Sequence, residues 1–419
     1  MQLSNKEIRE RLDAARNKII SLFCDQCTHG AQTAALHDPL VAACGQFLGD
    51  SARTVPQRGL HGTAAALAVI TQSPAPDKEK NETLTRLVRY ALDRAEAESK
   101  SDNPTSLSSI EVDAQNTIKT AELLLAVSCL PTSVPNSDRI HRVLVQSLKK
   151  GQLEERAWGY FLDQPESGPD LLPTAYATMA LAAADEDVAK PTQFLLDELS
   201  EDAGSASTAP HWDGDVTIRI VCLYALVFRK RADQYDLNSE QKLVTIFDVI
   251  WNRMERLIRG EHLEQNVEYW RSQHTFYVRV PWQLYLLALA ARLSFYKRFS
   301  TFGAQLRLKS IIDDVLAGKF RYPHSGVMIS SRTNAIAFEV LGHVQAEMRR
   351  KRVVSPLIWL DQVRTSSTLR WTVSICGVGL VVWSIIHWSN APNGVDLAEV
   401  APNFIASIVA WLALWARRR

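Results

Sequence analysis

Two kinds of helical pattern alternate along the chain. Thr174–Ala184 and Trp282–Ala291 are apolar around nearly the whole helix circumference, which is typical of helices contacted on every side. Leu84–Ala97 and Ser239–Ile258 are charged on one face and apolar on the other, as helices at a protein surface are. The alternation predicts an all-α fold in which inner helices are surrounded by outer ones.

The inner helices form a repeated series. Their starts share a small or hydroxylated residue followed by an Ala- and Leu-rich run, and they lie near Thr63, Thr120, Thr174, Thr217, Pro281 and Thr333. Each interval has room for two helices and their loops. About six helical pairs therefore predict an α/α toroid over residues 1–348, since a closed ring needs no polar capping repeats. An open solenoid of helical pairs is the alternative.

The segments that precede these helices share an aromatic residue and, in most of them, a turn rich in Gly and Pro. They read Trp158-Gly-Tyr-Phe with Gly168-Pro-Asp170, Trp212-Asp-Gly-Asp215, Tyr269-Trp270, and Phe320-Arg-Tyr-Pro-His-Ser-Gly326. With a helix that begins at Thr, this pattern resembles the repeats of the prenyltransferase and terpenoid-cyclase (squalene-cyclase-like) superfamily over about residues 55–345. The resemblance implies the toroid fold and leaves the activity open.

One lead-in segment contains candidate chemistry. Asp213-Gly-Asp215-Val216-Thr217 resembles the acidic motif of class II terpenoid cyclases, whose middle aspartate protonates an alkene or epoxide. The resemblance makes Asp215 the candidate catalytic residue, and such an acid must be neutral and shielded from water. Val216 replaces the final aspartate of the motif, so the acidic cluster is incomplete.

A structural role competes with catalysis at these aspartates. Asp113, Asp170 and Asp213 each lie four residues before a helix threonine, and a residue that recurs across repeats usually serves the fold. We therefore interpret Asp213 as structural, and Asp215 is also well placed to cap its helix. The prenyltransferase branch implies an Asp-x-Cys zinc site, which is not met here. We expect no metal and no cofactor.

The C-terminal residues predict a membrane anchor. Trp371–Trp388 and Val400–Ala416 contain no Lys, Arg, Asp or Glu and have about the minimum length of a membrane-spanning helix. A basic linker at 349–370 precedes them, Arg417–Arg419 follow, and the intervening turn lacks Lys and Arg. The positive-inside rule then predicts a two-span hairpin in the plasma or inner membrane, with both termini cytoplasmic. A buried helical pair of a soluble domain is the alternative.

Charge and anchor together restrict the function. The chain has a net charge of +1, with its basic excess at the C-terminus, so the body is mildly acidic and a nucleic-acid partner is not expected. The preferred hypothesis is a membrane-coupled recognition or sensing head, of the kind found in bacterial immunity effectors, with an isoprenoid, another lipid or a protein as ligand. The alternatives are an enzyme acting on an isoprenoid or other lipid, by cyclase-like acid chemistry or prenyl transfer, and an oligomeric membrane scaffold or pore component. Gly377 and Gly379 would allow close helix contacts in such a homo-oligomer.

Overall fold

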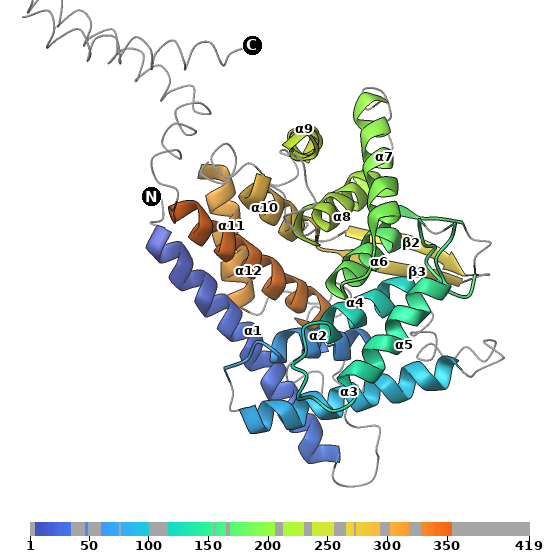
Figure 1. Cartoon of the computed structure of the whole chain (residues 1–419). Helices are drawn as coiled ribbons and strands as arrows, with labels where there is room; N and C mark the ends of the chain where they lie inside the picture. Colours follow the sequence, from blue (N-terminus) through green and yellow to red (C-terminus); the bar gives the residue numbers. More distant parts are fainter. Residues whose placement is uncertain are drawn as a thin grey trace, which may run out of the picture.

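Helices make up most of the described chain, which confirms the predicted all-α class (Figure 1). The computed structural model describes residues 5–34, 47–48, 60–74, 77–99, 116–154, 156–164, 168–205, 213–229, 237–254, 265–271, 274–293, 302–317 and 329–353. Its helices are α1 Asn5–Ala34, α2 Leu60–Ile70, α3 Asp77–Ser99, α4 Thr117–Val127, α5 Ser137–Lys150, α6 Leu171–Ala183, α7 Ala189–Ser205, α8 Asp213–Arg229, α9 Leu237–Met254, α10 Trp282–Leu293, α11 Phe302–Leu316 and α12 Ser331–Val353.

The even-numbered helices form the inner layer. Each of α2, α4, α6, α8, α10 and α12 packs against the next in chain order, and α12 also packs against α2. Figure 1 shows these helices around a common centre, with α1, α3, α5 and α7 outside them. Every residue of α6 from Leu172 to Leu181 is buried, as is α10 from Trp282 to Ala291. Neighbours on all sides explain why these two helices have no polar face.

The outer helices bury one stripe only. In α5, Ile140, Leu144 and Leu148 are buried at a spacing of four residues, which places them on one face toward α4 and α3. Helix α1 packs against α11, α12 and α2, so the N-terminal helix covers the junction between the first and the last inner helices. Apolar burial on one face and solvation on the other are what the amphipathic patterns predict.

Two small antiparallel pairs accompany the helices. Strand β1 (Phe47–Leu48) pairs with β4 (Ile329–Ser330), and β2 (Gln265–Arg271) forms a hairpin with β3 (His274–Val280). Val267 and Val278 lie opposite each other in the hairpin and are both buried. The segment around Tyr269-Trp270, expected to be a loop, is therefore part of a strand. Its alternating apolar positions are typical of a half-buried hairpin.

The inner-helix threonines bind the aromatic lead-in segment. Trp158 N–H donates to Thr174 Oγ1 at 3.0 Å, and that hydroxyl donates to the Asp170 carbonyl at 2.6 Å. Thr117 Oγ1 donates to the Gly159 carbonyl at 2.6 Å. Both threonines are completely buried. These threonine hydroxyls thus form hydrogen bonds with backbone groups of the lead-in segment and of the helix start, which would otherwise be buried without a partner.

The helix starts differ slightly from the expectation. Helix α6 begins at Leu171 and α8 at Asp213, several residues before the threonines that were expected to open them. Pro173 lies within the first turn of α6, where its missing N–H costs no helical hydrogen bond. The threonines therefore mark where the lead-in segment contacts each helix, and the helices themselves start earlier.

The membrane prediction is corrected by the structure. No helix in the described ranges is both long and apolar enough to cross a bilayer, which contradicts the assignment to a two-span plasma-membrane protein. The predicted spans at 371–388 and 400–416 lie outside the described residues. Helix α12 continues to Val353, so the first residues of the predicted basic linker are helical.

Removing the Thr174 hydroxyl tests the role of the lead-in contact. We expect Thr174→Val to lower the free energy of unfolding by about 1–3 kcal/mol, because it leaves the buried Trp158 N–H without its acceptor. Thr245→Val is the matched control, since that exposed hydroxyl bonds only within its own helix. Urea unfolding followed by circular dichroism measures both. Equal losses in the two variants would contradict the proposed role of Thr174.

Candidate functional site

A cavity of about 390 Å³ lies among the inner helices. Side chains from all six even-numbered helices and from α1 line it. Its volume falls within the range of small-molecule pockets, and its walls combine apolar side chains with a few polar groups. The arrangement suits a small organic molecule better than a folded partner.

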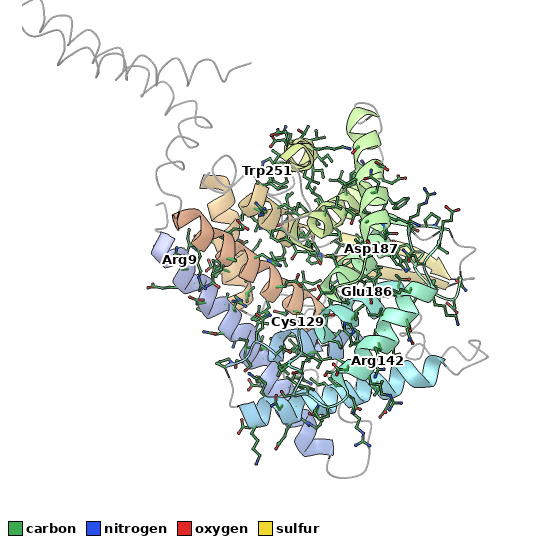
Figure 2. All side chains as sticks on the ribbon, in the orientation of Figure 1. Arg9, Cys129, Arg142, Glu186, Asp187 and Trp251 are labelled. Carbon is green, nitrogen blue, oxygen red and sulfur yellow. The ribbon has the colours of Figure 1, made fainter. Side chains whose placement is uncertain are left out.

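The cavity opens at the C-terminal ends of the inner helices. Gln72 and Cys129 lie just beyond the ends of α2 and α4, and Ala346 and Arg349 lie near the end of α12; all four line the cavity and are exposed. Cys129 is labelled in Figure 2, near the middle of the molecule. The opposite end is lined by buried side chains from the N-terminal halves of α6 and α10, namely Tyr176 and Tyr285. The cavity is therefore a chamber with one open end.

A buried ion pair forms the floor of the chamber. Arg332, at the start of α12, lies 2.6 Å from Glu122 Oε1 of α4. The Arg332 guanidinium also donates to Tyr176 Oη at 2.9 Å and to the Arg279 carbonyl. The side chains of Arg332 and Glu122 remain 13% and 14% exposed, which leaves a small part of each accessible. The pair neutralises its own charge at the floor.

Charge and burial set the protonation of this group. Burial alone would lower the pKa of Arg332, but Glu122 and the neighbouring phenols raise it above its ordinary value, so the guanidinium stays charged. Burial also raises the pKa of Tyr176 and of Tyr285, whose hydroxyls are 3.1 Å apart. Both phenols are therefore neutral hydrogen-bonding groups at physiological pH and cannot serve as bases.

Aromatic side chains form one wall. The ring of Tyr224 lies 4.6 Å from Tyr285 and 4.8 Å from Phe228, measured between ring centroids, and Phe228 lies 4.5 Å from His343. Tyr224 Oη donates to Glu339 Oε1 at 3.0 Å. Tyr224, Tyr285 and His343 line the chamber, and Phe228 supports them without being part of the lining. The two tyrosine hydroxyls are already hydrogen-bonded, to Glu339 and to Tyr176, which favours positioning of an apolar group over chemical attack on it.

The predicted catalytic residue remains a prediction. Asp213 and Asp215 lie in the first turn of α8, and their side chains are outside the described part of the structure. The described contribution of α8 to the chamber is Tyr224, nine positions after Asp215, which is roughly 13 Å along a helix axis. Asp215 thus lies near the N-terminal end of α8. The floor residues Tyr176 and Tyr285 likewise lie in the N-terminal halves of α6 and α10.

The recurring aspartate can be assessed at Asp170. It occupies the N-cap position of α6, as expected, but its side chain forms no capping hydrogen bond. Its carbonyl instead accepts from the Thr174 N–H and hydroxyl. Burial raises the pKa of Asp170, although its hydrogen bond with Leu171 opposes the shift. Asp170 thus lies at the helix start, as expected, but its backbone carbonyl and not its side chain accepts the hydrogen bonds there. Asp113 lies outside the described residues.

Metal ligation gains no support from the described side chains. Among them, no group of three or more His, Cys, Asp or Glu residues could hold an ion. Burial raises the pKa of Cys24, which opposes the thiolate form that a metal requires. His324 lies outside the described residues, and His274 opens strand β3.

Sequence reasoning did not find the residues that line the chamber. Glu122 and Arg332 are charged residues beside apolar runs of inner helices, and such a charge needs a partner when buried. That mismatch could have singled them out as a pair. The two residues are 210 positions apart, so only the fold shows which charges meet.

Removing one charge of the floor pair should be costly. We expect Arg332→Met to lower the free energy of unfolding by about 3–5 kcal/mol, because Glu122 is left buried without its cation. The double variant Arg332→Met with Glu122→Leu should be more stable than the single one, since neither charge remains. A double-mutant cycle from denaturant unfolding measures the coupling, and a double variant less stable than Arg332→Met would contradict the account.

Thiol reactivity tests where the chamber opens. Cys129 is exposed at the proposed mouth, whereas Cys222 is completely buried and burial raises its pKa to about 12. At pH 8 we expect iodoacetamide to modify Cys129 in the native protein and to spare Cys222, which is a neutral thiol there. Peptide mass spectrometry reads both sites, with urea-unfolded protein as the control. Protection of Cys129 in the native state would place the opening elsewhere.

Comparison with protein-family models, curated proteins and solved structures gives no match for this chain. The resemblance of its repeats to the terpenoid-cyclase-like superfamily therefore stays a prediction. Function has to be argued from the chamber itself.

Proposed function

We propose that the chain is an α/α toroid whose lumen is a recognition chamber for a small molecule. The cycle of contacts from α2 through α12 and back to α2 supports the toroid, since an open solenoid would leave its first and last helices apart. The observation that carries the proposal is the one-ended chamber of about 390 Å³ at the centre of this cycle.

The lining favours binding over proton transfer. An acid that protonates an alkene has to be neutral, but Glu122 is paired with the Arg332 guanidinium, which favours the carboxylate form. Glu339 likewise accepts from Tyr224. Most of the described polar groups of the lining therefore have partners that hold them in place, and this suits a preformed binding site.

Helix α12 would give such a chamber a sensing role. It contributes Arg332 at the floor, Phe338 and His343 along the wall, and Arg349 at the mouth. A ligand would thus contact one helix along most of its length. The same helix leads directly into residues 354–419, so a bound ligand could bias the position of the segment that follows.

Acid catalysis at Asp215 is the second candidate function. Its position in the first turn of α8, at the end of the helix nearest the floor, favours it. Conversion of an isoprenoid alkene by the protein, lost in Asp215→Asn, would establish catalysis. A protein that binds such a compound and returns it unchanged would support recognition instead.

The uncharged fluorophore N-phenyl-1-naphthylamine tests the chamber. We expect it to bind with one-to-one stoichiometry, because the aromatic and alanine walls of the chamber would remove its rings from water. Ala68→Trp fills the lining and should weaken binding at least roughly tenfold through steric overlap. Ala189→Trp, at an exposed position of α7, is the control and should bind normally.

Fluorescence titration measures these affinities, and circular dichroism checks that each variant is folded. Should Ala68→Trp not fold, Ala335→Phe fills the chamber from α12. The recognition chamber would be ruled out by a wild-type protein without saturable binding, or by equal affinities in the filled and control variants.

A further inference from the structure

The mouth of the chamber holds a fixed guanidinium from outside the ring. Arg16 of α1 donates from Nη1 to Gln345 Oε1 at 3.2 Å and from Nη2 to Gln72 Oε1 at 2.9 Å. Its guanidinium carbon lies 4.3 Å from the ring centroid of Phe338. Gly342 of α12 also lies beside the guanidinium, since a Cβ added at this glycine would be 3.5 Å from the guanidinium carbon. Contacts from α2 and α12 therefore hold the cation in one position.

The partners of Arg16 leave its charge uncompensated. Both hydrogen-bond acceptors are neutral amides, and within the described ranges Arg16 forms no ion pair. Asp13, a carboxylate whose charge acts on Arg16, accepts a hydrogen bond from Gln345 Nε2. The Arg16 Nε atom is buried and has no hydrogen-bond partner among the described residues. Arg16 thus carries a positive charge near the mouth that no described ion pair neutralises.

A second cation lies beside it. Arg349 lines the mouth and is close enough for its charge to act on Arg16. Burial lowers the pKa of Arg16; Asp13 opposes this shift and Arg349 adds to it, yet a guanidinium this far above neutrality remains charged. Two like charges at one opening cost free energy unless an anion lies between them.

The lining of the chamber interior suits an apolar part of a ligand and not a second charged group. Behind the mouth the chamber is lined by Ala64, Ala65 and Ala68 of α2 and by Met179, Ile336 and Phe338. At the floor the charges of Glu122 and Arg332 cancel. An apolar body suits this interior, and at the floor a second charge would meet an ion pair whose charges already cancel.

We propose that the chamber takes a small amphipathic anion, with one oxyanion group at Arg16 and Arg349 and an apolar body directed toward the floor. The oxyanion interacts with the guanidinium groups of Arg16 and Arg349, and the body packs on the alanine face of α2 and the Phe338 ring. This inference rests on the proposed function, because it names the ligand class of the same chamber.

A matched pair of probes isolates the charge. 1-Anilinonaphthalene-8-sulfonate has the ring system of N-phenyl-1-naphthylamine plus one sulfonate. We expect the wild-type protein to bind the sulfonate probe roughly tenfold or more tightly than the neutral one, since a charge-assisted hydrogen bond distinguishes them. Arg16→Met should abolish this preference, so that the two probes bind the variant with similar affinities.

The controls address charge and folding. Arg11→Met removes a cation from the same helix, but Arg11 is paired with Asp313 and does not line the chamber, so the preference should persist. Arg349→Met removes an exposed cation at the mouth and should reduce the preference only in part. Added sodium chloride should weaken binding of the sulfonate probe and not of the neutral one. Displacement of the sulfonate probe by 1-naphthoate or by 1-naphthyl phosphate then distinguishes a carboxylate from a phosphate ligand.

The outcomes separate this inference from the proposed function. If the neutral probe does not bind in the chamber, the recognition chamber itself fails. If the neutral probe binds there but the sulfonate gains nothing, or if Arg16→Met and Arg11→Met lower the preference equally, the chamber stands and the anionic ligand is refuted. If Arg16→Met does not fold, the Arg349→Met variant and the salt dependence decide whether the ligand is an anion.

Discussion

A helix that is packed on all sides has no place for an unpaired charge, and this constraint shapes the inner layer. Burial of an isolated ion or an unbonded backbone group costs several kcal/mol, so most buried polar atoms of the inner layer have defined partners. The consequence is visible near the N-terminal ends of the inner helices. Buried threonines bind the lead-in backbone at one position, and Arg332 binds Glu122 at another. The all-round apolar character of α6 and α10 has the same cause.

The same constraint separates what the sequence predicts from what it does not. Inner and outer helices are distinguished by local periodicity, which depends on each segment alone, so the all-α class and the alternation could be read from the chain. The position of Asp170 at a helix start is equally local. The hydrogen bond that holds that start was not predicted, because the Asp170 carbonyl, and not the side chain, accepts it from the Thr174 hydroxyl.

Long-range pairing explains most of the rest. Glu122, Tyr176 and Arg332 come from three separate repeats and meet only when the helices are packed. The strand at Tyr269 was missed because its aromatic pair matched a loop signature, whereas the buried Val267 and its partner Val278 belong to a hairpin. The membrane assignment rested on residues beyond Val353. In the described part of the chain, no helix is long and apolar enough to span a membrane. Asp215 stays a prediction, since its side chain is not described.

The contacts of helix α1 indicate at which stage of folding the chamber is completed. The contact of Arg16 with Gln345 joins residues 329 positions apart, and that of Arg11 with Asp313 joins residues 302 apart. Contacts of such separation form late, because the intervening chain must first be ordered. The mouth would thus be completed only after the last inner helix has been synthesised and docked. A molecule that binds Arg16 there would stabilise the folded inner layer by mass action and so couple ligand supply to the amount of fully folded protein.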